Sequence, residues 1–87
     1  MIKDPPIKNG QFAVLAVDGA TGHVLDIDGN LFRNDVPKDT FFVFADLISA
    51  RNFIQKRQVE NDSLEFVIYD HNLVTVEVLG APKWKSE

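Results

Sequence analysis

Cysteine is absent from this sequence, so neither a disulfide nor a cysteine-ligated metal can stabilise the fold. Long apolar runs are absent too, since none approaches the roughly 20 residues that a membrane-spanning helix requires. The first ten residues, MIKDPPIKNG, lack the apolar segment of a secretory signal peptide. Together these absences predict a cytoplasmic protein that makes no contact with a membrane.

Basic residues are also in short supply. Nine Lys and Arg against thirteen Asp and Glu give a net charge of −4, whereas nucleic-acid-binding proteins usually present a basic face. A small basic cluster, Arg51, Lys56 and Arg57, falls in a predicted helix and is interpreted as its solvated side. The charge pattern therefore argues against nucleic acid as a partner.

The sequence does contain enough apolar material for one core. Its 87 residues are 45 % hydrophobic and include seven Phe. This content is not that of a disordered chain, and the length is too short for two cores. We expect a single small domain over residues 1–87, with an ordered core at about 10–80 and a short tail at each end.

The chain is organised around residues 40–59, TFFVFADLISARNFIQKRQV. The first part of this stretch holds four consecutive aromatic or β-branched residues, from Phe41 to Phe44, which would fall on four different sides of a helix. Such a run is typical of a short strand that is buried on both faces, and it predicts a strand at about 40–44.

The second part of the stretch predicts a helix at about 46–59, because its apolar residues recur at intervals of three and four and share one side. Asp46 can cap the first turn by accepting a backbone N–H, and its charge suits the positive end of the helix dipole. The apolar stripe consists of Leu47, Ala50, Phe53 and Ile54.

Other stretches have the residue content of strands. Both faces of residues 12–18 are apolar, so this strand is expected inside the sheet. Residues 23–28 alternate between apolar and polar, which predicts a half-solvated strand in a hairpin with it. Residues 64–69 and 73–79 predict a second hairpin, joined by a turn at 70–72 whose residue types tolerate left-handed backbone.

The predicted fold class is α+β. The order β-β-β-α-β-β, with a brief extra strand at 31–33, gives a mostly antiparallel sheet of four to five strands with one helix packed on one face. In the last strand, Val74, Val76 and Val78 are expected to form the apolar face. Any Phe or Val left on the uncovered side of the sheet would form an association surface. The polar residues expected where that side meets water are Asp26, Asp28, Thr75 or Glu77.

The residues of catalytic or metal-ligating type are His23, Asp26, Asp28, Asp70 and His71. Strand alternation places His23 on the opposite face from Asp26 and Asp28, which opposes a shared metal site. Nucleophilic catalysis has no support, because there is no cysteine and no Gly-x-Ser-x-Gly turn. The sequence therefore predicts a protein that is not an enzyme, with no catalytic residue, no cofactor and no metal.

Protein recognition is the function that the sequence favours. We expect a non-enzymatic protein-interaction or accessory module, and a homodimer is one form of it because exposed strands can pair edge to edge. A small ligand-binding or nucleic-acid-binding domain is the alternative. The expected contacts lie at the second hairpin, on the helix and in the carboxy-terminal tail, and they are Tyr69, Asp70, His71, Arg51, Arg57 and Trp84.

Overall fold

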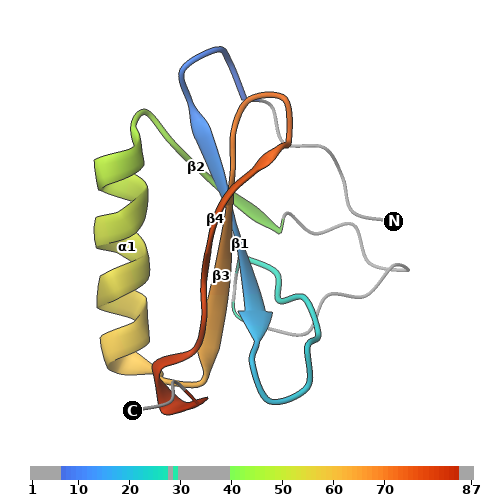
Figure 1. The fold of residues 1–87 in the computed structure, drawn as a ribbon, viewed down its shortest axis with the longest axis vertical. Helices are drawn as coiled ribbons and strands as arrows, with labels where there is room; N and C mark the ends of the chain where they lie inside the picture. The colour runs from blue at the N-terminus through green and yellow to red at the C-terminus, as the bar shows by residue number, and fades with distance from the viewer. Residues whose placement is uncertain (1–6, 28, 30–39, 85–87) are drawn as a thin grey trace.

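A computed structural model of the chain describes residues 7–27, 29 and 40–84. Four antiparallel strands form one sheet in the spatial order β2-β1-β3-β4. The helix α1 packs against one face of this sheet (Figure 1), which confirms the predicted α+β class. In chain order the elements are β1 (Phe12–Asp18), β2 (Phe41–Phe44), α1 (Leu47–Glu60), β3 (Leu64–Tyr69), β4 (Thr75–Leu79) and a short 3₁₀ turn, η1 (Pro82–Trp84).

The strand β1 lies inside the sheet, as its two apolar faces predict. It pairs with β2 on one side and with β3 on the other. Val14 and Ala16 join the core under α1, while Ala13 and Leu15 are buried on the opposite face. A strand whose two faces are both buried needs no polar alternation, and this accounts for the unbroken apolar sequence of β1.

The helix begins where the sequence predicts and is held at its first turn by Asp46. The carboxylate of Asp46 accepts a hydrogen bond from the backbone N–H of Ser49 at 2.7 Å, and this bond lowers the pKa of Asp46 below its ordinary value. Ala50 and Ile54 are buried against the sheet. The predicted helix is therefore confirmed, with its last residue at Glu60.

A group of aromatic rings fills the space between α1 and the sheet. Phe53 lies at its centre, with ring centroids 4.7 Å from Phe42 and 5.1 Å from Phe44 on β2. The ring of Phe66 on β3 meets Phe53 nearly edge-on at 6.2 Å. Offset and edge-on contacts of this kind add to the burial energy of each ring, so Phe53 joins the helix to two strands.

The prediction that the strand at 40–44 is buried on both faces was wrong. In the sheet, β2 lies at an edge and pairs with β1 alone. Phe42 and Phe44 face Phe53, while Val43 faces away from the helix and is exposed. The run of aromatic residues thus reflects a dense helix-side core and not a central strand.

The predicted strand at 23–28 reduces to a single antiparallel bridge between Val24 and Val17. Beyond this bridge the chain turns, because the backbone N–H of Gly29 bonds to the carbonyl of Asp26. Asp26 is only 5 % exposed, whereas Ile27 is exposed, so these two residues do not follow the predicted faces, although Leu25 is buried as predicted. Asp28 and the strand predicted at 31–33 lie outside the described residues.

Candidate functional site: the exposed side of β4

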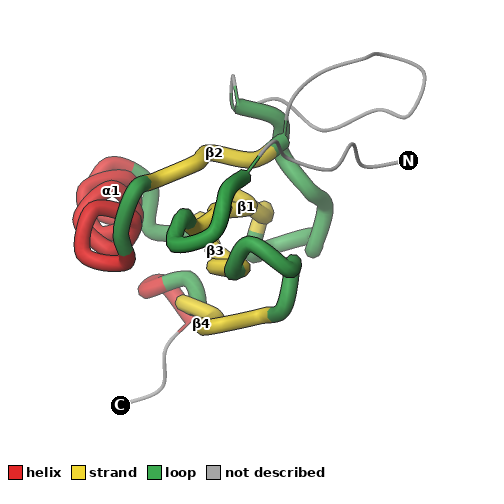
Figure 2. Tube along the Cα trace, turned by 90° about the horizontal axis from the view of Figure 1, so that it is seen from above, coloured by secondary structure: helices red, strands yellow, loops and turns green. Residues whose placement is uncertain are grey.

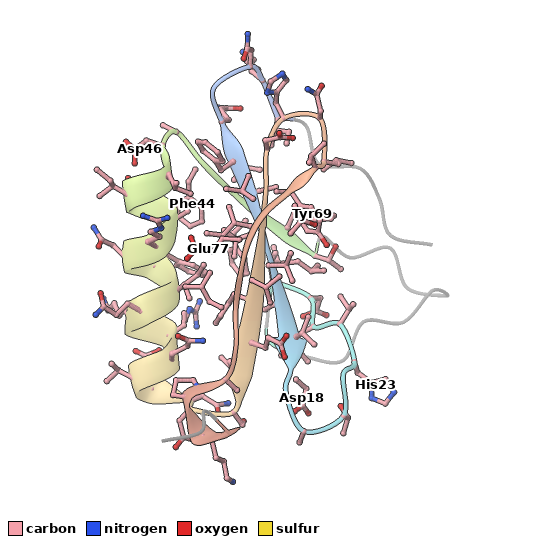
Figure 3. All side chains as sticks on the ribbon, in the orientation of Figure 1. Asp18, His23, Phe44, Asp46, Tyr69 and Glu77 are labelled. Atoms are coloured by element: carbon pink, nitrogen blue, oxygen red, sulfur yellow. The ribbon has the colours of Figure 1, made fainter. Side chains whose placement is uncertain are left out.

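The polar residues of catalytic type do not converge. Among residues 7–27, 29 and 40–84, no group of three or more His, Asp or Glu side chains could hold a metal ion. His23 is exposed in the loop after β1 and points away from the sheet (Figure 3). Asp70 shapes its own turn, because its Oδ1 accepts the backbone N–H groups of Asn72 at 2.8 Å and Val74 at 3.0 Å.

The residues expected at the tip of the second hairpin have separate surroundings. Tyr69 is half-buried and its ring meets Phe41 edge-on at 5.9 Å, on the side of the sheet away from α1. The two residues come from β2 and β3, the strands on either side of β1, so their rings meet across β1, where Ala13 is fully buried. His71 is exposed in the turn, and Trp84 belongs to η1. Their role as partner contacts stays a prediction.

The two arginines expected as contacts serve different parts of the molecule. Arg51 reaches β4, where its Nε lies 3.0 Å and its Nη2 2.9 Å from Oε1 of Glu77. Arg57 lies over the ring of Phe53, 5.1 Å from its centroid, and 6.0 Å from that of Phe42. Arg51 and Arg57 therefore have separate surroundings, although they look alike in the sequence.

Several of the large apolar side chains that are exposed in the described residues lie on β4 or directly before it. Glu77 pairs with Ile68 in the ladder and therefore shares the face of the sheet that α1 covers. Val78 pairs with Val67 and lies on the other face. Val74, Val76 and Val78 are 58 %, 42 % and 56 % exposed. The predicted face assignment of the last strand was thus wrong.

We call Leu73, Val74, Val76 and Val78 the apolar strip. The strip follows an outer strand of the sheet (Figure 2), since among the described strands β4 pairs with β3 alone. The one charged residue of β4 is Glu77, and Arg51 neutralises it from the helix. Neither proline nor lysine protects the strand, although both are common devices at sheet edges.

The backbone of the apolar strip carries two irregularities. Glu77 pairs with Ile68 but Thr75 pairs with Tyr69, so Val76 is an additional residue that forms a β-bulge. Leu73 has a φ of 61°, the one positive value among non-glycine residues that the structure describes. The left-handed position of the turn is therefore at Leu73 and not at residues 70–72, which corrects the sequence-based expectation.

A second feature is a pocket between the carboxy-terminal half of α1 and the sheet, with a volume of about 280 Å³. Apolar and aromatic residues make up most of its lining, and Arg57 and two acidic residues also belong to it. Because these residues come from segments far apart in the sequence, no local pattern indicated the pocket. Its lining is Ala16, Leu25, Asp26, Ile27, Gly29, Phe42, Phe53, Arg57, Glu60, Asn61, Leu64 and Phe66.

Comparison of the chain with models of known protein families, with curated proteins and with solved structures finds no match in any of the three. In the part of the chain that the structure describes, no helix has the length and apolar content needed to cross a membrane. Functional inference therefore depends on the two surface features above.

Proposed function

We propose that the protein is a non-enzymatic protein-interaction module that binds through the apolar strip. The observation that carries this proposal is the exposure of three valines along an outer strand whose single charge is already neutralised within the molecule. Full burial of a valine contributes roughly 1.5 kcal/mol relative to leaving it exposed. The fold obtains only part of this energy from the strip, so most of it is available to a partner.

The backbone of Leu73 supports the same conclusion. A leucine in the left-handed region costs about 1–2 kcal/mol that glycine would not incur. Burial does not offset this cost well, because Leu73 is itself exposed. Strained residues that persist without a gain for the fold are typical of binding surfaces. An apolar side chain at this turn lengthens the strip by one residue.

The partner that fits the apolar strip is a second copy of the chain. Two copies related by a two-fold axis would place identical apolar surfaces against each other, and the charge of Glu77 would lie outside this contact, on the helix-covered face where Arg51 neutralises it. The bulge at Val76 interrupts a regular ladder, so side-chain packing would contribute more than backbone pairing. Four side chains cover less than the roughly 800 Å² per partner of a standard interface. The dimer should therefore be weak, with a Kd of about 10 μM or higher.

Sedimentation equilibrium of the full chain from about 10 μM to 1 mM tests this proposal. The wild type should pass from monomer to dimer across this range, and Val76→Lys should remain monomeric because it places a charge within the strip. Val59→Lys is the matched control, since Val59 is 83 % exposed on α1, away from β4. This control should dimerise like the wild type.

Two results would contradict the proposal. A wild type that is monomeric at 1 mM would exclude self-association through this surface. Equal weakening of the dimer by both lysine substitutions would show that added charge alone disfavours association, wherever it is placed. Thermal melting of both variants separates these outcomes from unfolding.

A further inference from the structure

We infer that the pocket beside Arg57 binds a small planar aromatic molecule that carries a single carboxylate. The inference is independent of the apolar strip, which lies along β4, while the pocket opens between α1, β2 and the loop that follows β1. Three properties of the pocket support it, namely an aromatic wall, a guanidinium with no acidic partner and a rigid frame.

The aromatic wall of the pocket is the reason to expect a flat ring in the ligand. Phe42, Phe53 and Phe66 line the pocket together, and their rings are already arranged at angles of 44° and 79° to one another through Phe53. Phenyl rings set at such angles accept a further flat ring by edge-on or offset contact. The volume of about 280 Å³ is at the lower end of ligand pockets, so it suits one or two fused rings.

Arg57 accounts for the carboxylate. Its guanidinium lies over Phe53 and makes no hydrogen bond or ion pair with any residue that the structure describes. Stacking on a ring leaves the edge of the guanidinium free, and that edge presents parallel N–H donors that match two carboxylate oxygens. Arg51, by contrast, is occupied by Glu77. Arg57 therefore supplies the charged donors at the pocket that no described residue occupies.

The other polar groups of the lining limit the charge of the ligand. Asp26 and Glu60 also border the pocket, and the last turn of α1 places the negative end of the helix dipole there. A doubly charged phosphate would be repelled by these groups, while a single carboxylate can be matched by the one guanidinium. The lining thus favours a monoanion over a polyanion.

A rigid frame holds the wall of the pocket in place. The side-chain amide of Gln58 donates to the carbonyl oxygens of Leu64 at 3.1 Å, Gly80 at 3.2 Å and Leu79 at 3.4 Å. These contacts tie the end of α1 to the ends of β3 and β4. Because Phe53 and Arg57 belong to the same helix, the position of both pocket residues is fixed before a ligand arrives, and little ordering energy is lost on binding.

The test is an NMR titration of the uniformly labelled full chain with sodium benzoate and with indole-3-carboxylate. Both should shift the resonances of Phe42, Phe53 and Arg57 with a saturable curve in the millimolar range or tighter. Benzamide keeps the ring but lacks the charge, and benzylamine reverses the charge. Both should bind at least tenfold more weakly than benzoate. Methyl phosphate, an anion without a ring, should not bind.

Substitutions of Arg57 test whether its guanidinium binds the carboxylate of the ligand. Arg57→Gln should weaken the binding of benzoate at least tenfold and leave the binding of benzamide unchanged. Arg57→Lys keeps the charge without the paired donors, so its affinity for benzoate should lie between those of Arg57→Gln and the wild type. Lys56→Gln is the matched control, because it removes one positive charge from the neighbouring position, outside the lining of this pocket. This control should bind benzoate like the wild type.

Three results would overturn the inference. Benzylamine binding as tightly as benzoate would show that Asp26 or Glu60 governs the pocket. Benzoate shifts that persist in Arg57→Gln would place the ligand elsewhere. The absence of any saturable shift at 20 mM benzoate would show that the pocket takes no such ligand. None of these results depends on whether the protein dimerises.

Discussion

The two sides of the sheet differ in how far their apolar side chains are exposed. On the side that α1 covers, Phe66 is 1 % exposed and Phe53 contacts three other rings. At the β4 end of the other side, the valines of the apolar strip are exposed, although the sequences of both regions have the same β-strand character. One helix cannot cover a four-stranded sheet on both faces. The covered side therefore holds the core, whereas the apolar strip stays exposed to solvent.

The largest expected effect is a difference in stability between substitutions on the two sides. Phe66→Ala should lower the free energy of unfolding by about 3–5 kcal/mol, because it removes a buried ring and leaves a cavity. Val78→Ala should change it by no more than about 0.5 kcal/mol, because the side chain is exposed. Urea denaturation followed by circular dichroism measures both values. If Val78→Ala lowered the free energy of unfolding as much as Phe66→Ala, the strip would be part of the core. If Phe66→Ala is largely unfolded, Phe66→Leu can replace it in the comparison.

A smaller effect tests whether the strip is maintained at a cost to the fold. Leu73→Gly should raise the free energy of unfolding by about 0.5–1 kcal/mol, since glycine adopts the left-handed conformation without strain. The same change should weaken self-association in sedimentation experiments. Val74→Gly serves as the control, because its φ is not positive, and it should be destabilising. A destabilised Leu73→Gly would show that the leucine contributes to the fold itself.

The smallest effect concerns the ion pair between α1 and β4. A double-mutant cycle of Arg51→Ala and Glu77→Ala should give a coupling energy of about 0.2–1 kcal/mol, as for other solvent-exposed pairs. The coupling should decrease in 1 M salt because of screening. Glu77→Ala should nevertheless strengthen or preserve self-association, whereas Arg51→Ala should weaken it by leaving Glu77 uncompensated. Equal effects of the two single changes on association would contradict the role assigned to this pair.

Much of the fold could be predicted from local sequence because the deciding forces were local. The bounds of β1 and β3 follow from two short runs rich in apolar residues, and the start of α1 follows from Asp46 and the apolar spacing after it. Alternation correctly separated Glu77 from Val78, but it placed Thr75 with Glu77, whereas the bulge at Val76 brings Thr75 opposite Tyr69, on the same face as Val78. It could not show which face the helix would cover, since that depends on how β4 pairs with β3.

The candidate sites were harder to predict from the sequence. The apolar strip was read as a buried face, because exposed valines are less common than buried ones. The pocket combines Leu25, Phe42 and Arg57, which are brought together by the antiparallel pairing and by helix packing. Arg51 and Arg57 looked alike in the sequence, yet one neutralises Glu77 and the other stacks on Phe53. Only tertiary contacts separate their roles.

The bulge at Val76 has a consequence for the proposed self-association of this protein. A straight, apolar outer strand can recruit one chain after another, and such open-ended growth produces fibres. An additional residue in the middle of β4 twists the strand and breaks the even spacing of its outward N–H and C=O groups. A third chain then finds no matching ladder to extend. Association should stop at a closed pair, so that the protein stays in solution at concentrations where the strip is occupied.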